Sequence, residues 1–324
     1  MTSKCSCLVS QSVLHFRRRF TTSPKDHVFD LHSTLLESSR FGEQKSYEVV
    51  LSSDFSVGNA PNGGYLMNIA IAAGVSAGDS DGPVLAANGY YVMKAEEAIT
   101  ATILCNVLKS KANGPTTVEV VISQKKTVRC KFLVTIGSHK TEHTLENNCC
   151  ITAPKLPQPG ECKDATSVLR NLLGNDLKVA KQFDFKVANN SIFAQSVLKD
   201  VASHDGPAEY EGWLKFSHQR KMCPRALAFM LDALPPPIHI ISPITSSLWV
   251  PTINYGVHIW NDDNTHSAHN SLSRLSEVWY PFRFKSPCVI NGFVQTDGAI
   301  WSPCGTILLA TSRQMARVFP PRPK

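Results

Sequence analysis

The stretch that decides the fold runs from Tyr65 to Val75 and reads Tyr-Leu-Met-Asn-Ile-Ala-Ile-Ala-Ala-Gly-Val. Nearly all of its residues are apolar, and many of them are small. A helix that is apolar on all sides has to be buried on all sides, and small side chains let a sheet close around it. Gly74, Gly78 and the polar residues that follow end the helix. We therefore predict a central helix wrapped by a sheet.

Strand-like segments surround this predicted helix. One segment precedes it at 45–51, and four follow it, at 84–93, 99–108, 116–123 and 128–137. The turn signals between the four are short, which is typical of an antiparallel sheet rather than of βαβ units. The first half of the chain is thus predicted to contain a strand, a buried helix and then four strands.

The second half repeats this order of elements, although its residues do not repeat. A predicted strand at 210–217 precedes an apolar helix at 224–234, which three prolines end, and four strands follow, at 247–260, 276–284, 288–296 and 306–318. The recurrence indicates an internal duplication. We expect a targeting or disordered basic tail at 1–25, two halves at 40–138 and 204–319, and a linker with connecting elements, including a short helix at 167–173, at 139–203.

Composition and charge exclude several classes of function. The chain has 324 residues, of which 43% are hydrophobic and 18% charged, and its net charge is +7. Five Lys and Arg residues and no acid lie in residues 1–25, so the remainder holds 28 basic and 26 acidic side chains. No stripe of basic and aromatic residues is present, and no apolar run has the roughly 18–20 residues needed to cross a bilayer. We expect a globular protein with no nucleic-acid partner and no membrane span.

The N-terminal tail and the cysteines bear on location. Residues 1–25 are rich in Ser, Thr and Arg and free of acids, which is typical of a mitochondrial transit peptide, and Arg17–Ser23 resembles a processing site. A disordered tail or a misplaced start codon in a cytoplasmic protein is the alternative. The ten cysteines form no Cys-x-x-Cys motif and no zinc-type group with histidines. We expect reduced thiols, no metal and no cofactor.

Asp232 stands out in the second predicted helix. Pro224–Leu234 reads Pro-Arg-Ala-Leu-Ala-Phe-Met-Leu-Asp-Ala-Leu, in which Asp232 is the only polar residue after Arg225. A carboxylate in an apolar setting is costly unless it is hydrogen-bonded or paired. Either Asp232 bonds to backbone at the helix end, or the fold retains it for catalysis. A carboxylate near a helix C-terminus is unfavourable by about 0.3–1 kcal/mol, which weighs against the first interpretation.

Two strand residues are further candidates, each weak evidence alone. In the segment 249–258, alternation places Val250, Thr252 and Asn254 on one face of a strand, so Thr252 is predicted to point inward. In the last strand, Gln314 is the polar residue farthest along a face of small residues. A strand threonine is more often structural than catalytic, and that alternative stays open.

Taken together, these segments resemble the acyl-CoA thioesterase family of TesB type, and particularly its fungal and bacterial thioesterase-like branch. The resemblance covers about residues 40–319 in the family's order. It rests on short strings, namely Pro-Asn-Gly-Gly-Tyr-Leu at 61–66, Gly-Trp-Leu-Lys-Phe at 212–216, Ala-Leu-Ala-Phe-Met-Leu-Asp-Ala at 226–233, Trp-Val-Pro-Thr-Ile at 249–253, Asn-Gly-Phe at 291–293, and 305–318 with Ser-Arg-Gln-Met-Ala at 312–316.

The resemblance implies an α+β double hotdog fold, in which each half is a curled antiparallel sheet around a central helix and the two sheets join back to back. It implies acyl-CoA as the substrate and thioester hydrolysis as the reaction. The family's catalytic Asp, Thr and Gln fall on Asp232, Thr252 and Gln314. Hydrolysis requires a water, a base and donors for the oxyanion. Asp232 would be the base, and Thr252 and Gln314 would hold the water.

The start of the first helix is the predicted oxyanion and substrate-binding site. Backbone N–H groups near Gly63, Gly64 and Tyr65 would receive the negative charge, because glycines allow close approach and the helix dipole favours an anion there. The alternative is that the Gly-Gly pair only makes a turn. If these residues do bind the oxyanion, the site is shared between the halves.

Other functions compete with hydrolysis by this triad. Gly74–Gly78 matches the Gly-x-Ser-x-Gly pattern of serine hydrolases, with Ser76 as nucleophile, but that motif has to follow a strand and open a helix. A hotdog protein that binds acyl-CoA without hydrolysis, or that acts in biosynthesis, is a second alternative, because one fold hosts many functions. A homo-oligomer formed through the sheets is compatible with the sequence.

Overall fold

The computed structural model describes residues 36–41, 44–80, 82–110, 114–137, 150–167, 170, 178–191, 193–194, 208–218, 220, 222–241, 250–261 and 278–319. The predicted tail at 1–25 lies outside these residues, as do Trp249 and most of the short helix predicted at 167–173.

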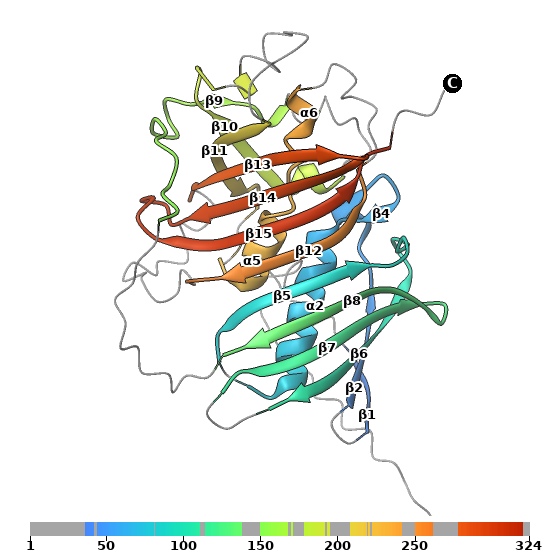
Figure 1. Cartoon of the computed structure of the whole chain (residues 1–324). Helices are drawn as coiled ribbons and strands as arrows, with labels where there is room; N and C mark the ends of the chain where they lie inside the picture. Colours follow the sequence, from blue (N-terminus) through green and yellow to red (C-terminus); the bar gives the residue numbers. More distant parts are fainter. Residues whose placement is uncertain are drawn as a thin grey trace, which may run out of the picture.

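Thirteen strands of the described chain form one antiparallel sheet, in the order β1-β2-β6-β7-β8-β5-β12-β15-β14-β13-β11-β10-β9 (Figure 1). The first half supplies β1 (Leu36–Phe41), β2 (Gln44–Val50), β5 (Val84–Tyr91), β6 (Thr100–Lys109), β7 (Thr116–Gln124) and β8 (Thr127–Ile136). The second half supplies β9 (Lys163–Asp164), β10 (Phe183–Val187), β11 (Glu209–Phe216), β12 (Thr252–Ile259), β13 (Tyr280–Ile290), β14 (Phe293–Trp301) and β15 (Leu308–Arg317). A separate pair, β3 (Ser56–Val57) and β4 (Ala60–Pro61), precedes the first helix.

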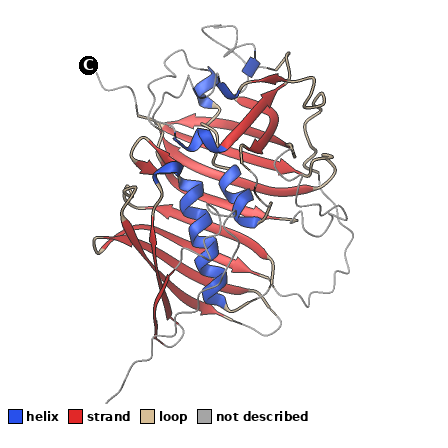
Figure 2. Cartoon of the chain, turned by 180° about the vertical axis from the view of Figure 1, so that it is seen from behind, coloured by secondary structure: helices blue, strands red, loops and turns tan. Residues whose placement is uncertain are grey.

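The predicted central helix is α2 (Gly63–Gly78), and it packs against β6, β7 and β8. Most of its residues are fully buried, as a helix apolar on all sides requires. It ends at Asp79, which adopts a left-handed conformation with φ 45°. Its partner α5 (Pro224–Met230) lies beside it on the same face of the sheet, so the two helices share one core (Figure 2). The described chain also contains the helix α6 (Ile238–Ile241) and the short 3-10 helices η1 (Ser53–Phe55) and η2 (Lys178–Gln182), and residues 166–167, 170 and 193–194 are helical as well.

The two halves have the same internal arrangement. Neighbouring strands run β2-β6-β7-β8-β5 in the first half and β11-β13-β14-β15-β12 in the second. The halves meet through antiparallel pairing of β5 with β12, in which Ala87 lies opposite Val257. The expectation that the sheets join back to back is therefore wrong. Pairing edge to edge satisfies the backbone groups that a free edge strand would leave exposed.

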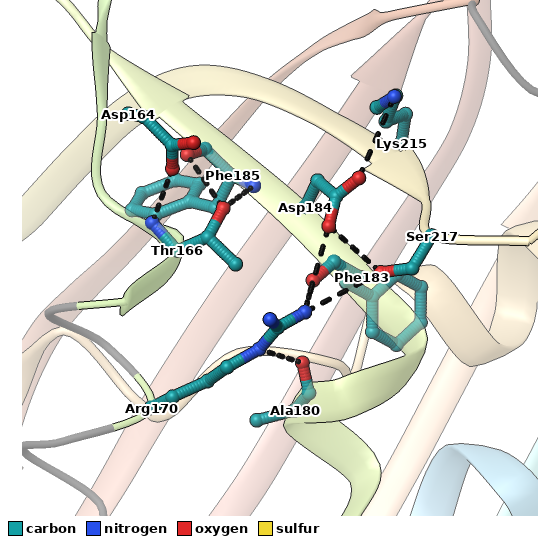
Figure 3. Close-up of polar contacts among 9 residues, drawn as sticks. All are labelled: Asp164, Thr166, Arg170, Ala180, Phe183, Asp184, Phe185, Lys215 and Ser217. Carbon is teal, nitrogen blue, oxygen red and sulfur yellow. Dashed lines mark hydrogen bonds and ion pairs between the residues drawn. The ribbon is translucent and has the colours of Figure 1, made fainter.

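The segment between the halves contributes strands of its own. β9 and β10 lie within the predicted linker and extend the second half's sheet beyond β11. Side chains fix them there: the Thr166 hydroxyl bonds both the N–H and the carbonyl of Phe185, and Arg170 donates to the carbonyls of Ala180 and Phe183 (Figure 3). Asp184 accepts a hydrogen bond from Ser217 on the neighbouring chain segment. The second half thus begins earlier than its helix and strand pattern indicates.

Three element boundaries in the second half differ from the prediction. The break expected between Phe284 and Cys288 is a bulge within β13, and the chain turns instead at Asn291-Gly292, where both residues have positive φ. An Asn-Gly pair suits such a turn because both residues tolerate this conformation. Helix α5 ends at Met230 rather than at residue 234, so Asp232 lies in the turn after the helix.

Candidate active site

Asp232 lies where the short helix α5 gives way to the proline-rich turn. Pro224 occupies the first turn of α5, where its missing N–H is not needed, and Leu231 caps the other end. The N–H of Asp232 donates to the carbonyl of Phe229 at 3.2 Å, which continues the turn for one more residue. The residue is partly exposed, whereas both of its neighbours are buried. This turn carries the carboxyl group toward the start of α2.

The carboxylate of Asp232 is held from both sides. Its Oδ2 atom accepts hydrogen bonds from the N–H of Gly64 at 2.7 Å and from Nδ2 of Asn62 at 3.0 Å. Its Oδ1 atom accepts from Nε2 of Gln314 at 2.9 Å, and the same nitrogen donates to Oγ1 of Thr252. The structure therefore brings Asp232, Gln314 and Thr252 together, and it adds the N-terminus of α2 from the first half.

Gln314 and Thr252 point toward the carboxylate from neighbouring strands. Gln314 follows the regular alternation of β15, and Thr252 lies next to a register shift in β12. Ala310, Ser312, Gln314 and Ala316 share the buried face of β15, as the alternation predicts. Leu308 was predicted on this face and is not on it, because a register shift next to Ala310 places it with Ala299 and Trp301 in a separate cluster. In β12 a register shift lies between Thr252 and Asn254, so Asn254 faces the opposite side, where it pairs with Met315. The prediction that Thr252 and Asn254 share a face is wrong, because a bulge shifts the alternation by one residue.

The surroundings of Asp232 raise the pKa of its carboxyl group to about 6 from the ordinary 3.8. Although the residue as a whole is partly exposed, desolvation of its carboxyl group among the surrounding protein atoms is the largest cause, and the hydrogen bonds from Gly64, Gln314 and Asn62 oppose it. The nearby hydroxyl groups of Tyr91, which is partly buried, and Tyr255, which is fully buried, have pKa values well above their usual range because of desolvation, and they stay neutral. A carboxylate that titrates near neutrality is suited to take and return a proton.

Protein atoms engage two of the first three N–H groups of α2. Asn62 caps the helix by accepting from the N–H of Tyr65 at 3.0 Å, and the N–H of Gly64 donates to Asp232. Among the described residues, no acceptor engages the N–H of Gly63, whose carbonyl accepts from the Tyr91 hydroxyl at 2.7 Å. Of the three predicted oxyanion donors, two are thus occupied by protein atoms, and the N–H of Gly63 is available.

Gly64 is a glycine for steric reasons. A Cβ atom at this position would lie 2.8 Å from Cβ of Asp232 and 3.1 Å from the carbonyl oxygens of Ala228 and Phe229. Real Cβ atoms do not tolerate such approaches, so only glycine lets α2 and α5 meet this closely. The Gly-Gly pair is therefore more than a turn: it sets the distance between the two halves at the carboxylate.

Sequence reasoning missed Asn62 as part of this site. Its position just before the helix is a recognisable N-cap signal, since Asn is among the preferred capping residues. Nothing in the local sequence connects it to Asp232, which lies 170 residues away. Tyr91 and Tyr255 were missed as well, for the same reason.

The setting of Ser76 does not match a nucleophile elbow. Ser76 lies inside α2 near its C-terminus, and its Oγ accepts a hydrogen bond from the Tyr47 hydroxyl at 3.0 Å. An elbow needs a sharp turn from a strand into a helix, and here a helix runs through the whole motif. In the part of the chain that the structure describes, no group of three or more His, Cys, Asp or Glu side chains is placed to hold a metal ion. No helix in that part is long and apolar enough to span a membrane.

Comparison of the whole fold with solved structures defines its class. The chain is similar to a provisionally assigned thioesterase II from Thermobifida fusca (20% identity, 92% of this chain and 100% of the other, TM-score 0.70). It is also similar to a hot dog fold protein of unknown function from Alicyclobacillus acidocaldarius (17%, 91% and 99%, TM-score 0.69). A third is the acyl-CoA thioesterase II TesB2 from Mycobacterium marinum (15%, 91% and 99%, TM-score 0.63). The protein is a double hotdog of the α+β class.

The family follows from the sequence of the second half. Residues 159–318 match the family model described as the acyl-CoA thioesterase C-terminal domain. No curated protein sequence matches the chain. The predicted resemblance and fold class are confirmed, and family and fold together support thioester hydrolysis as the general class of activity.

Proposed function

We propose that the protein hydrolyses acyl-CoA to a free carboxylic acid and CoA, with Asp232 as general base. The observation that carries this proposal is the carboxylate of Asp232, which is held between the N-terminus of α2 and the amide of Gln314 and has a pKa of about 6. A base with this pKa is ionised at neutral pH and still basic enough to accept a proton from water.

Gln314 and Thr252 are suited to hold the attacking water. Both protons on Nε2 of Gln314 are engaged, by Asp232 and Thr252, and its Oε1 accepts no hydrogen bond from the described residues. The hydroxyl of Thr252 accepts from Gln314, which leaves its own proton free to donate. A water between these groups would find an acceptor, a donor and the base within reach.

The reaction balances with these groups alone. The oxygen of the water bonds to the thioester carbonyl carbon while Asp232 takes one proton from that water. The carbonyl oxygen becomes an oxyanion. The N–H of Gly63, at the positive end of α2, would stabilise this charge. As the tetrahedral intermediate collapses, the C–S bond breaks and the CoA sulfur receives the proton held by Asp232. Acid and thiol leave, and the carboxylate is restored.

A thiol-release assay over acyl-CoA substrates of increasing chain length tests the proposal. Wild-type protein is expected to release CoA, and Asp232→Asn and Gln314→Ala variants are expected to lose release while keeping the circular dichroism of the wild type. Parallel reactions with acyl groups on an acyl carrier protein show which carrier is used. Binding of acyl-CoA without thiol release by the wild type would overturn the proposal in favour of an acyl-CoA-binding protein.

A further inference from the structure

Asn62 uses every hydrogen-bonding group of its side chain at the boundary between the two halves. Its Oδ1 accepts from the N–H of Tyr65 at 3.0 Å, which caps α2. Its Nδ2 donates to the backbone carbonyl of Asp232 and to Oδ2 of Asp232, both at 3.0 Å. An amide nitrogen carries two protons, so both are used. The side chain is only 8% exposed, and water therefore offers it little alternative.

The orientation of this amide is fixed by its neighbours. Reversing it would place Oδ1 against the carbonyl and carboxylate oxygens of Asp232 and would turn Nδ2 toward the N–H of Tyr65. Three favourable contacts would become three repulsive ones. The backbone of Asn62 is extended, with φ −60° and ψ 145°, as an N-cap residue requires. The amide is therefore locked by the helix it caps, independently of Asp232.

Asn62 differs from the other partners of Asp232 in what it holds. Gly64 and Gln314 each contact one carboxylate oxygen, and neither contacts the main chain of Asp232 through a hydrogen bond. Asn62 bonds the carboxylate and the backbone carbonyl of the same residue. It thus fixes the direction from the backbone to the carboxyl group, which lies in a turn rather than within a helix.

We propose that Asn62 is the positioning residue of the site, whose locked amide aims the carboxylate of Asp232 by holding its main chain and its side chain together. This inference rests on the proposed function of Asp232 as a base. It assigns to the capping residue of one half a role in the chemistry of the other half. Asn62 touches neither water nor thioester in this scheme and acts through Asp232.

The pH dependence of the site gives this role a signature. The hydrogen bond from Asn62 lowers the pKa of Asp232 against the effect of burial, so its removal raises that pKa. The titratable groups that face the carboxylate are Tyr91 on β5 and Tyr255 on β12, and both stay neutral because their pKa values are well above the usual range. Gln314 on β15 and the start of α2 contribute no charge. A shift in the acid limb of the profile of kcat/KM against pH therefore reports a change in the pKa of Asp232.

Two substitutions separate positioning from capping. Asn62→Ser keeps an oxygen that caps the helix but has no amide nitrogen, and Asn62→Asp keeps the cap while placing a second carboxylate against Asp232. We expect kcat/KM at pH 7 to fall roughly 10- to 100-fold in the serine variant, because the base is misaimed. We expect the acid limb of its pH profile to move up by about one unit, and that of the aspartate variant to move further.

The 13C shift of labelled Asp232 carboxyl, assigned with an Asp232→Asn sample, measures the pKa directly in wild type and variants. This reading does not need activity, so it tests the inference even if the wild type releases no thiol, which would count against the proposed function instead. A purely structural cap predicts an unchanged pKa of Asp232 and an unchanged pH profile in the serine variant, which adds no charge beside the carboxylate. An unchanged pKa of Asp232, or an unchanged pH profile of kcat/KM, in the serine variant would overturn the proposal. A rise in the pKa of Asp232 in the serine variant, and a larger rise in the aspartate variant, would support it.

Discussion

The two halves of the molecule share one arrangement of strands, but they differ in the strand that lies next to the seam between them. Strands β8 and β15 occupy corresponding places, each next to the strand at which the halves meet. The inner face of β15 includes the buried polar residues Ser312 and Gln314. The buried face of β8 is wholly apolar and consists of Cys130, Phe132, Val134 and Ile136. Strand β8 thus contributes only apolar side chains to the core, whereas β15 presents the amide of Gln314 to a carboxylate.

The two helices contribute to the site with opposite ends. Helix α2 has 16 residues and contributes its N-terminus, with the cap of Asn62 and the free N–H of Gly63. Helix α5 has seven residues and contributes the carboxylate that follows its C-terminus. A carboxylate is unfavourable at the end of its own helix and favourable at the start of another. The duplicated halves therefore do not form two equivalent sites. The first half supplies the N-terminus of α2, and the second half supplies the carboxylate that lies against it.

The largest expected effect is the loss of kcat on removing the carboxylate of Asp232, which lies against the start of α2, compared with that of Asp79, which lies at its end. Asp232→Asn is expected to lower kcat about 10²- to 10⁴-fold, because an amide cannot accept the proton of the attacking water. Asp79→Asn is the matched control, since Asp79 ends α2 away from the site in a left-handed conformation that asparagine tolerates. Steady-state thiol release measures both. Equal losses in the two variants would contradict a site confined to one end of the helix.

A second pair of variants tests the contribution of the first half to the oxyanion. Gly63→Pro removes the backbone N–H at the first helical position, where proline is favoured, and Asn62 already has the extended backbone that precedes a proline. Gly63→Ala keeps the N–H but introduces the same Cβ contact, 3.0 Å from Oδ2 of Asp232. We expect kcat of the proline variant to be about 10²- to 10³-fold below that of the alanine variant.

Equal kcat values for these two variants would show that the N–H of Gly63 does not bind the oxyanion. The division of labour between the halves would then reduce to the positioning of Asp232. Thermal unfolding of both variants, followed by circular dichroism, checks that the helix start is retained.

The contact between the halves is the third target. Gly64→Ala places a Cβ atom 2.8 Å from Cβ of Asp232, so α2 and α5 have to move apart. We expect a loss of about 1–3 kcal/mol in the free energy of unfolding, measured by urea denaturation, together with reduced activity. Gly160→Ala is the control, because its Cβ would meet no atom within 4 Å. A Gly64→Ala variant as stable as this control would show that the close approach is dispensable.

The smallest expected effect is on stability as a function of pH. Because the pKa of Asp232 is raised in the folded state, the folded protein binds its proton more tightly than the unfolded chain does. The contribution of Asp232 to stability is therefore greatest below the ordinary pKa of 3.8 and declines as pH rises toward about 6. The difference in urea midpoint between wild type and Asp232→Asn, measured from pH 4 to 7, should follow this decline. A difference that grows in the wild type's favour as pH rises would contradict it.

The sequence predicted most elements because their patterns are local. The apolar stretch within α2 and the alternation along β15 each depend on neighbours in the chain, and the buried faces of α2 and of β15 from Ala310 onward were predicted correctly. The bulge at Thr252 and the bulge near Pro287 were missed, since an extra residue in a strand leaves the composition unchanged and shows itself only in the pairing. The Asn-Gly pair at 291–292 is a typical turn signal, but no turn was predicted there.

The sequence by itself predicted the two apolar helices and the antiparallel strands that follow each of them. Through the family resemblance it also identified Asp232, Thr252 and Gln314 as candidate catalytic residues. Only the tertiary structure decided that β5 and β12 join the sheets edge to edge, and that Asn62 and Gly64 then lie against a carboxylate nearly 170 residues away. The physical reason is that helix and strand patterns record which face is buried. They do not record which distant element covers it, because many elements would bury an apolar face equally well. The partners of Asp232 follow from that choice of pairing.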